Sequence, residues 1–297
     1  MNIPFDSGIV QRCALVKGKN HDGTHIAPFP VGEEYLFMKG QPNLKIQSDC
    51  NNCLDREPEF FCRLSPASLE NFKAIKITNS YQKGARLFIE GQPSEGVYML
   101  CSGRVKLTAH SRHGKALILG ISGPGEVLGL SAAVSKCSFE TTAEAIEPCQ
   151  VSFVRSTDFC RFLDQNGDAG MNAIRQLSSQ YNTAHAQIRS IALSSCAADK
   201  LANLLLEWSK GATPDNGVIR MKMTFSHEEL AEMIGTSRET VTRTLKDFRE
   251  LNLIEIKGSD LYVKDTQELE RTIGNGKRIK NVQSSGAQID LTNGFHA

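Results

Sequence analysis

The chain has 297 residues, of which 40% are hydrophobic and 23% are charged, so it has room for more than one domain with its own core. Its 34 Lys and Arg residues against 33 Asp and Glu leave a net charge of +1, which argues against a positively charged coat that holds nucleic acid non-specifically but does not exclude a small reading surface. No apolar run approaches the ~20 residues that span a bilayer, and no secretory signal is visible, so we expect a cytoplasmic protein with no membrane partner.

The first half of the chain changes from an irregular pattern to a period of two. Residues 1–49 show no sustained periodicity and predict a flexible N-terminal extension. Within residues 50–163, apolar residues alternate in "GVYMLCSGRVKLTAHSRHGKALILGI", and "CSGR" and "SRHG" supply turns. This pattern predicts an antiparallel double-sheet β-roll rather than an α/β fold.

A narrow apolar stripe follows in residues 164–195, which we predict to form one long helix. Its members are spaced by 3, 4, 3, 4 and 3 residues, which is the spacing of a coiled-coil seam. A stripe this narrow suits a helix that pairs with its twin better than one that lies on a broad core, although packing on the roll is the alternative. The predicted dimer seam consists of Ile174, Leu177, Tyr181, Ala184, Ile188 and Ile191.

Residues 196–268 predict a winged helix-turn-helix, which makes the fold class α+β, and residues 269–297 predict a flexible tail. In "TFSHEELAEMIGTSRETVTRTLKDFRELNLI", Ser226 and Glu229 form a capping box, and Gly235 permits a sharp turn. Thr236 or Ser237 then caps the second helix. The segment "LIEIKGSDLYVKD" predicts a strand pair, the wing.

The second of these helices carries its polar side chains at its N-terminal end, which is the part of a recognition helix that enters the major groove. Arg238 and Arg243 could contact guanine O6 and N7, and Glu239 could accept a hydrogen bond from a cytosine amino group. The alternative is a surface ion pair between Glu239 and Arg243, four residues apart. The upstream helix, the glycine turn, the wing and the dimer seam favour DNA reading.

The order of roll, dimer helix, helix-turn-helix and wing resembles the CRP/FNR family of bacterial transcription regulators, over residues 50–265. The most specific match is "SRETVTR" at 237–243, which is similar to the reading motif of the cyclic-AMP receptor branch. The resemblance implies base contacts by Arg238, Glu239 and Arg243 in TGTGA-like half-sites of double-stranded DNA. Thr236, Ser237 and Thr242 would hold phosphates or flanking groups. It also implies a homodimer on an inverted repeat, and contact with RNA polymerase.

Two kinds of signal remain open for the roll. In the cyclic-nucleotide branch of the family, an Arg followed by Ser or Thr holds the cyclic phosphate. This chain keeps Gly125-Glu126-Val127 but has "KCSFE" at 136–140, where the arginine would be expected. Without a guanidinium the phosphate loses its bidentate partner, so we do not expect a cyclic nucleotide to be the effector.

The cysteines suggest a metal centre as the other signal. Cys50, Cys53 and Cys62 form a C-x2-C-x8-C cluster, and C-x2-C spacing lets two thiolates bind one iron or zinc ion. Cys149 lies where the oxygen-sensing FNR proteins place their fourth ligand, so the resemblance implies a [4Fe-4S] cluster sensitive to oxygen or nitric oxide. The FNR spacing is C-x2-C-x5-C, and structural zinc or unmetallated thiols are the alternatives.

An enzyme is the remote alternative, because rolls of this kind also build metal-dependent cupins. Such a site needs an H-x-H pair, whereas the close pair here is His110-x-x-His113 in a predicted turn. No Ser–His–Asp set and no phosphate-binding P-loop stands out in the sequence. We therefore predict a regulator and not an enzyme.

Overall fold

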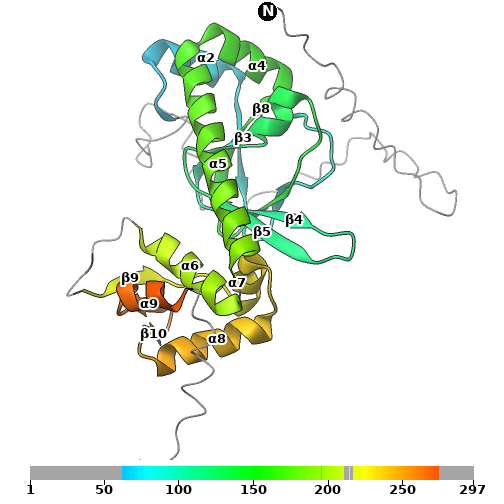
Figure 1. The fold of residues 1–297 in the computed structure, drawn as a ribbon. Coiled ribbons are helices and arrows are strands. Elements are labelled where there is room, and N and C mark those ends of the chain that lie inside the picture. Colours follow the sequence, from blue (N-terminus) through cyan, green and yellow to red (C-terminus); the bar gives the residue numbers. More distant parts are fainter. Residues whose placement is uncertain (1–61, 195, 211–213, 215–216, 274–297) are drawn as a thin grey trace, which may run out of the picture.

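The period-two region forms two four-stranded antiparallel sheets, in the computed structural model that describes residues 62–194, 196–210, 214 and 217–273 (Figure 1). The first sheet has the order β1-β8-β3-β6, formed by Ile77–Tyr81, Cys149–Arg155, Gly96–Ser102 and Val127–Leu128. The second has the order β2-β7-β4-β5, formed by Arg86–Phe88, Thr142–Ala145, Val105–His110 and Ala116–Ser122. The predicted antiparallel roll is confirmed.

The roll has one apolar core between its sheets and a second core under its helices. Leu100 and Val151 of the first sheet pack with Val105 and Ala143 of the second. Helices flank the other side of the first sheet, where the second core lies: α2 (Pro66–Ile75), α3 (Leu130–Ser135) and α4 (Ser156–Gln165). The roll is therefore a closed unit with its own hydrophobic interior.

Helix α2 begins at Pro66, because its first turn is stabilised by two sets of hydrogen bonds. The Ser65 side chain accepts a hydrogen bond from the Ser68 N–H, and Pro66 occupies the first helical turn. The Asp168 carboxylate accepts hydrogen bonds from the Ser65 N–H at 2.7 Å and from the Ser68 hydroxyl at 2.6 Å. These bonds tie the start of α2 to the start of the long helix α5.

Helix α5 (Gly167–Leu193) runs from the roll toward the C-terminal domain (Figure 1). It is separate from α4, so the predicted span 164–195 contains the end of one helix and all of the next. Gln176 is buried in α5 and bonds the backbone of Val127, donating to its C=O at 2.7 Å and accepting from its N–H at 2.9 Å. That pair of bonds fixes α5 against the edge strand β6.

The C-terminal domain consists of four helices around one core and a three-stranded wing. Its elements are α6 (Ala197–Ser209), β9 (Ile219–Lys222), α7 (His227–Ile234), α8 (Arg238–Glu250), β10 (Ile254–Lys257), β11 (Asp260–Val263) and α9 (Thr266–Thr272). The sequence predicts β10 and β11 but not β9, which pairs with β11 as a third strand. Helix α9 extends past residue 268 with Leu269 fully buried, so the domain continues into the predicted tail.

Some of the predicted segments lie outside the residues that the structure describes. The extension at 1–49, together with Cys50 and Cys53, lies outside the described residues, as does the tail from residue 274. Within the described part of the chain, no helix combines the length and the apolar character that a membrane crossing requires.

Candidate functional site

The turn between α7 and α8 is built by local hydrogen bonds that the sequence predicts. The Glu229 N–H donates to the Ser226 hydroxyl at 3.2 Å and the Ser226 N–H donates to the Glu229 carboxylate at 2.9 Å, which completes the capping box. Gly235 ends α7 with φ of 66°, a left-handed conformation that glycine adopts at little cost. Ser237, rather than Thr236, caps α8 by accepting a bond from the Thr240 N–H at 3.3 Å.

The orientation of α8 is fixed by its apolar face. Val241, Leu245 and Phe248 are all fully or almost fully buried in the core of the C-terminal domain. They contribute to one cluster with Leu201 and Leu205 of α6. Since three side chains at helical spacing are held in this core, the opposite face of α8 is presented to solvent in a defined direction.

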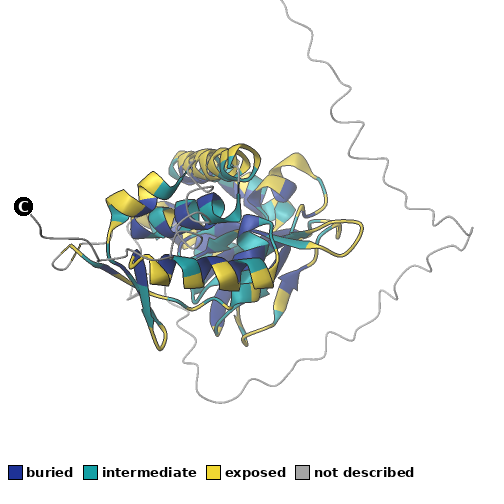
Figure 2. Ribbon diagram, turned by 60° about the horizontal axis from the view of Figure 1, so that its bottom comes forward, coloured by how far each residue is buried: buried dark blue, intermediate teal, exposed yellow. Residues whose placement is uncertain are grey.

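The predicted reading residues occupy that exposed face. Arg238, Glu239, Thr242 and Arg243 are exposed in the first two turns of α8, whereas Thr236 in the preceding turn is half-buried. Figure 2 shows exposed and buried segments alternating along the helices of this domain. The structure therefore brings the predicted residues together at one helix end.

The alternative of a local ion pair is not realised. No ion pair joins Glu239 to Arg243 among the described residues, although Lys246 and Glu250 do pair at 3.5 Å further along the same helix. Glu239 instead turns back to the helix start, where hydrogen bonds from its own backbone N–H and the Ser237 hydroxyl lower its pKa. The carboxylate is thus held as an acceptor at the N-terminus of α8.

Thr242 has a different setting from the other reading residues. Its hydroxyl donates to the Arg238 C=O at 2.9 Å and lies 2.8 Å from Nδ1 of His227 in α7. Because the hydroxyl is the donor to the carbonyl, the histidine N–H is the natural donor to the hydroxyl. His227 could not be identified from the sequence, because its contact with Thr242 depends on how α7 crosses α8.

The predicted dimer seam lies on an exposed face of α5 in the single chain. Ile174 is 61% exposed, Tyr181 is 63% exposed and Ile188 is 62% exposed. Ala184 is also exposed, Leu177 packs partly on the roll core, and Ile191 is half-buried. Large apolar side chains that are this exposed along one stripe are unusual in an isolated domain.

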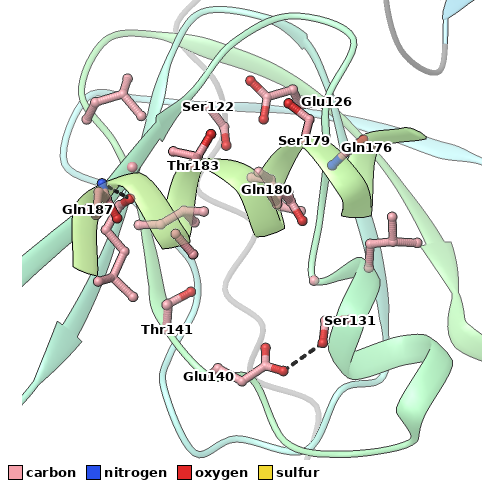
Figure 3. Close-up of a pocket in the computed structure, with 18 of the residues that line it drawn as sticks. Ser122, Glu126, Ser131, Glu140, Thr141, Gln176, Ser179, Gln180, Thr183 and Gln187 are labelled. Carbon is pink, nitrogen blue, oxygen red and sulfur yellow. Dashed lines mark hydrogen bonds between the residues drawn. The ribbon is translucent and has the colours of Figure 1, made fainter. Parts of the chain in front are cut away.

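A pocket of about 590 Å³ lies between the roll and α5 (Figure 3). Its apolar wall comes from β5, β6 and the aromatic pair Phe88 and Phe139, whose ring centroids are 4.0 Å apart. Thr141 and Glu140 face Thr183 and Gln180 of α5 across the opening. The pocket therefore lies against the helix that carries the predicted seam.

The pocket lining contains two carboxylates, Glu126 and Glu140, and no Lys, Arg or His within the described part of the chain. Burial raises the pKa of Glu126, against hydrogen bonds from the Gly123 N–H and the Ser122 hydroxyl that lower it. Glu140 is exposed at the rim and accepts a bond from the Ser131 hydroxyl at 2.9 Å. Lys136, the nearest cation in the sequence to the expected phosphate ligand, is exposed and does not line the pocket.

Of the four predicted cluster ligands, Cys62 and Cys149 are in the described residues. Cys149 is fully buried between the sheets, and its thiol donates to the backbone carbonyls of Glu147 at 3.1 Å and Arg104 at 3.3 Å. Burial raises the pKa of this thiol, against the hydrogen bonds to the Arg104 and Glu147 carbonyls that lower it. A side chain on Gly103 would also collide with this sulfur, with a Cβ only 2.7 Å away.

Cys62 directly precedes residues that lie on the helical side of the roll. The next residue, Arg63, accepts a hydrogen bond from Asn172 of α5, and Leu64 belongs to the core under the helices. Among the residues that the structure covers, no group of three or more His, Cys, Asp or Glu side chains could hold a metal ion. In the described structure Cys149 is thus a buried thiol with two carbonyl partners.

The C-terminal domain contacts the roll through α7, which packs against the β4–β5 hairpin. Lys115 Nζ donates to the Gly235 C=O at 3.4 Å, and Lys106 Nζ lies 3.7 Å from the Glu229 carboxylate. Leu117, which also lines the pocket, lies 3.9 Å from the Cβ position of Gly235. One strand thus contacts both the pocket and the turn before α8, a connection that the sequence does not reveal.

Comparisons with known proteins agree with this geometry. Residues 78–166 match the cyclic nucleotide-binding domain and residues 199–272 match the Crp-like helix-turn-helix domain. A CRP-like cAMP-activated global transcriptional regulator of Mycobacterium tuberculosis is 22% identical over 64% of this chain and 85% of its own. A global nitrogen regulator of Nostoc is 26% identical over 66% of this chain and 88% of its own.

The fold is also that of solved regulators. The c-di-GMP responsive regulator CLP of Xanthomonas campestris superposes with a TM-score of 0.59 at 22% identity, covering 67% of this chain and 99% of that one. The matched family consists of transcription regulators and not of enzymes, which removes the cupin alternative. The chain belongs to the CRP/FNR family of DNA-binding transcription regulators.

Proposed function

We propose that this regulator binds an inverted repeat with TGTGA-like half-sites as a homodimer. Arg238, Glu239 and Arg243 would contact base edges in the major groove, with Thr236, Ser237 and Thr242 at phosphates or flanking positions. The observation that carries the proposal is the state of the first three side chains: exposed, at one helix N-terminus, and without an ion pair between Glu239 and Arg243. Because they are not paired with each other, reading a base would not require such a pair to be broken first.

The packing of α8 against the domain core supports the same proposal. Direct readout requires that donors and acceptors arrive at fixed positions in the groove, and the buried Val241, Leu245 and Phe248 provide that rigidity. The capping bonds of Ser237 and the box of Ser226 with Glu229 fix the turn itself. Sequence-specific contacts are worth roughly 1–3 kcal/mol for each bidentate pair, so small shifts of the helix would be costly.

The homodimer follows from the exposed stripe on α5. Pairing two copies along Ile174, Tyr181 and Ile188 would cover side chains that are more than half exposed in the single chain. A two-fold axis along α5 would place the two α8 helices to read symmetric half-sites about one helical turn apart. Family membership also implies contact with RNA polymerase, which a two-hybrid assay against the polymerase subunits would test.

The experiment for DNA reading is a fluorescence anisotropy titration at one fixed salt concentration. One duplex carries the inverted TGTGA-like repeat and the control duplex has the same base composition in scrambled order. The proposal predicts tighter binding to the repeat by about 10³-fold or more. Equal affinity for both duplexes would contradict base reading.

The signal is a separate question, and the structure favours the pocket over a cluster. The [4Fe-4S] hypothesis would require Cys149 to give up its hydrogen bonds to the Arg104 and Glu147 carbonyls in order to bind iron. Cys50 and Cys53 lie outside the described residues, so the cluster stays a prediction on the cysteine spacing. Anaerobic purification followed by an absorption spectrum and analysis for iron, sulfide and zinc tests it, and a metal-free protein with full DNA affinity would remove both metal hypotheses.

Related regulators respond to different small molecules. The M. tuberculosis relative is named as cAMP-activated and the X. campestris structure as c-di-GMP responsive. For this chain we propose control by a small molecule in the roll pocket, because the pocket touches both α5 and the strand that contacts α7. Occupancy could then change both the seam and the position of α8.

A further inference from the structure

We infer that the roll pocket takes a small, largely apolar molecule without an anionic group, and that it rejects cyclic nucleotides. This inference deepens the proposed control through the pocket but does not depend on which DNA sequence α8 reads. It rests on the composition of the walls, on the sign of the charges at the site and on the state of the polar groups that face the cavity.

The walls provide apolar surface on most sides. Leu107, Leu117, Leu119 and Ile121 come from the paired strands β4 and β5, and Leu128 comes from β6. The stacked rings of Phe88 and Phe139 form a flat surface at an interplanar angle of 16°. A cavity of about 590 Å³ with such walls suits a ligand with one or two rings or a comparable aliphatic body.

The charges at the site are unfavourable for a phosphate. A buried phosphate requires a guanidinium, an ammonium or a set of backbone N–H groups to replace its water, and the described lining offers no Lys, Arg or His. Glu126 and Glu140 instead place two carboxylates on opposite parts of the lining. A nucleotide would lose its hydration and meet charges of its own sign.

The two carboxylates have different roles. Glu126 is tied inward, because its carboxylate accepts a bond from the Gly123 N–H at 2.9 Å, so it is part of the wall. Glu140 is exposed at the rim, where its bond from Ser131 leaves acceptor capacity on the carboxylate. A ligand that carries a hydrogen-bond donor or an amine could turn that group toward Glu140 and leave its apolar body inside.

The remaining polar groups are neutral. Ser179, Gln180 and Thr183 of α5 close the side opposite Glu140 (Figure 3). Gln187 is already engaged, because its side-chain amide donates to the Leu119 C=O at 2.6 Å. Hydroxyl and amide groups at this wall suit a neutral ligand and do not compensate for the missing cation.

The test uses two fluorescent probes that share one aromatic skeleton: phenylnaphthylamine, which is neutral, and anilinonaphthalenesulfonate, which adds a sulfonate. The full-length protein should bind the neutral probe at least about tenfold more tightly than the sulfonated one. Cyclic AMP added in excess should not displace the neutral probe. Binding of the sulfonated probe or cyclic AMP as tightly as the neutral probe would overturn the inference, and so would failure of the neutral probe to bind.

Three variants locate the effect in the pocket. Glu140→Gln should narrow the preference between the probes, and Glu140→Arg should bring the sulfonated probe to equal or tighter binding. Thr183→Trp should block both probes by filling the opening from the surface of α5. If Thr183→Trp leaves binding unchanged, the probe occupies another surface such as the exposed seam, and the inference fails.

Thermal unfolding of each variant confirms that it is folded before its binding is interpreted. The anisotropy titration with the inverted repeat is run on the wild-type protein in parallel, without probe. Loss of base discrimination there would contradict the proposed DNA reading while leaving the result on the pocket intact, so the two failures are distinguishable.

Discussion

Helices α5 and α8 carry apolar stripes of similar regularity, but the stripes have opposite environments. In α8 the apolar residues Val241, Leu245 and Phe248 are buried and the polar face is exposed. In α5 the apolar residues Ile174, Tyr181 and Ile188 are each more than 60% exposed. Figure 2 shows that α5 is exposed along most of its length, in contrast to the alternation seen in α8.

The two helices use their apolar faces differently. The stripe of α8 is satisfied within the chain, so its polar residues are available for a ligand and we infer that the ligand is DNA. The stripe of α5 is not covered within the chain, so we propose that its apolar residues form the binding surface for a second copy. Each helix can be tested by a change at its exposed face.

The largest expected effect comes from placing a charge in the seam of α5. Ile174→Glu would put two like charges opposite each other at the two-fold axis and should convert the dimer to monomers. Losing one half-site should weaken binding to the inverted repeat by about 100-fold or more. Analytical ultracentrifugation and the anisotropy titration measure the two quantities.

The matched control is Ala186→Glu, on the exposed outer side of the same helix. It adds the same charge away from the seam and should leave both the dimer and its DNA affinity in place. Dissociation of both variants, or of neither, would show that the stripe is not the interface.

The next effect is expected at the tip of α8. Arg238→Ala should weaken binding to the repeat by about 10- to 100-fold, because one bidentate base contact is lost, and should relax the preference at one G·C pair. The measurement compares the variant on the repeat and on duplexes with that pair exchanged. Arg249→Ala, at the exposed far end of the same helix, is the control and should not alter preference at that pair. A uniform loss on all duplexes would assign Arg238 to phosphates instead.

A smaller effect distinguishes the two residues before α8. Ser237→Ala removes the side-chain acceptor that caps the helix and should lower the free energy of unfolding of the C-terminal domain by about 1 kcal/mol. Thr236→Ala should cost less, because the capping bond comes from Ser237 and not from Thr236. Denaturant unfolding of the two variants gives this difference, and a larger loss from Thr236→Ala would mean that the cap is misassigned.

The smallest expected effect concerns pH and the link between α2 and α5. Burial raises the pKa of Asp168, but hydrogen bonds from Ser65 and Ser68 outweigh it, and the pKa is lowered from the ordinary aspartate value. The contribution of Asp168 to stability is therefore present above that ordinary value and is lost as the pH falls through the lowered one. An NMR titration should give an Asp168 midpoint below that of a model aspartate, and Asp168→Asn should remove this acid-dependent step. An Asp168 midpoint equal to that of a model aspartate would contradict the hydrogen bonds that join Asp168 to Ser65 and Ser68.

Much of the C-terminal domain could be predicted from the sequence, because its capping and turn motifs involve residues close together in the chain. The capping box of Ser226 with Glu229 and the turn at Gly235 are short-range patterns, and the structure confirms both. The β-roll is confirmed for the same reason, since alternation and glycine turns are read from neighbouring residues. The strand β9 was missed because a four-residue strand that pairs across the domain leaves little local signal.

The pocket and its connections could not be predicted, because they depend on residues far apart in sequence. Glu140, Thr183 and Leu117 line one cavity only after the roll and α5 have packed together. The contact of Lys115 with the Gly235 C=O spans 120 positions in the chain. Cys149 was a candidate ligand by spacing, whereas its burial and its two carbonyl partners become visible only in the fold.

The central proposal is that the N-terminal end of α8 reads bases in each half of a homodimer. The most direct test is to select tight-binding duplexes from a random pool with the purified wild-type protein. The selected duplexes should converge on an inverted repeat whose half-sites lie about one helical turn apart. The same selection with Arg238→Ala should lose information at one G·C pair in each half-site. Selection that returns no shared element, or a single unrepeated one, would contradict the account.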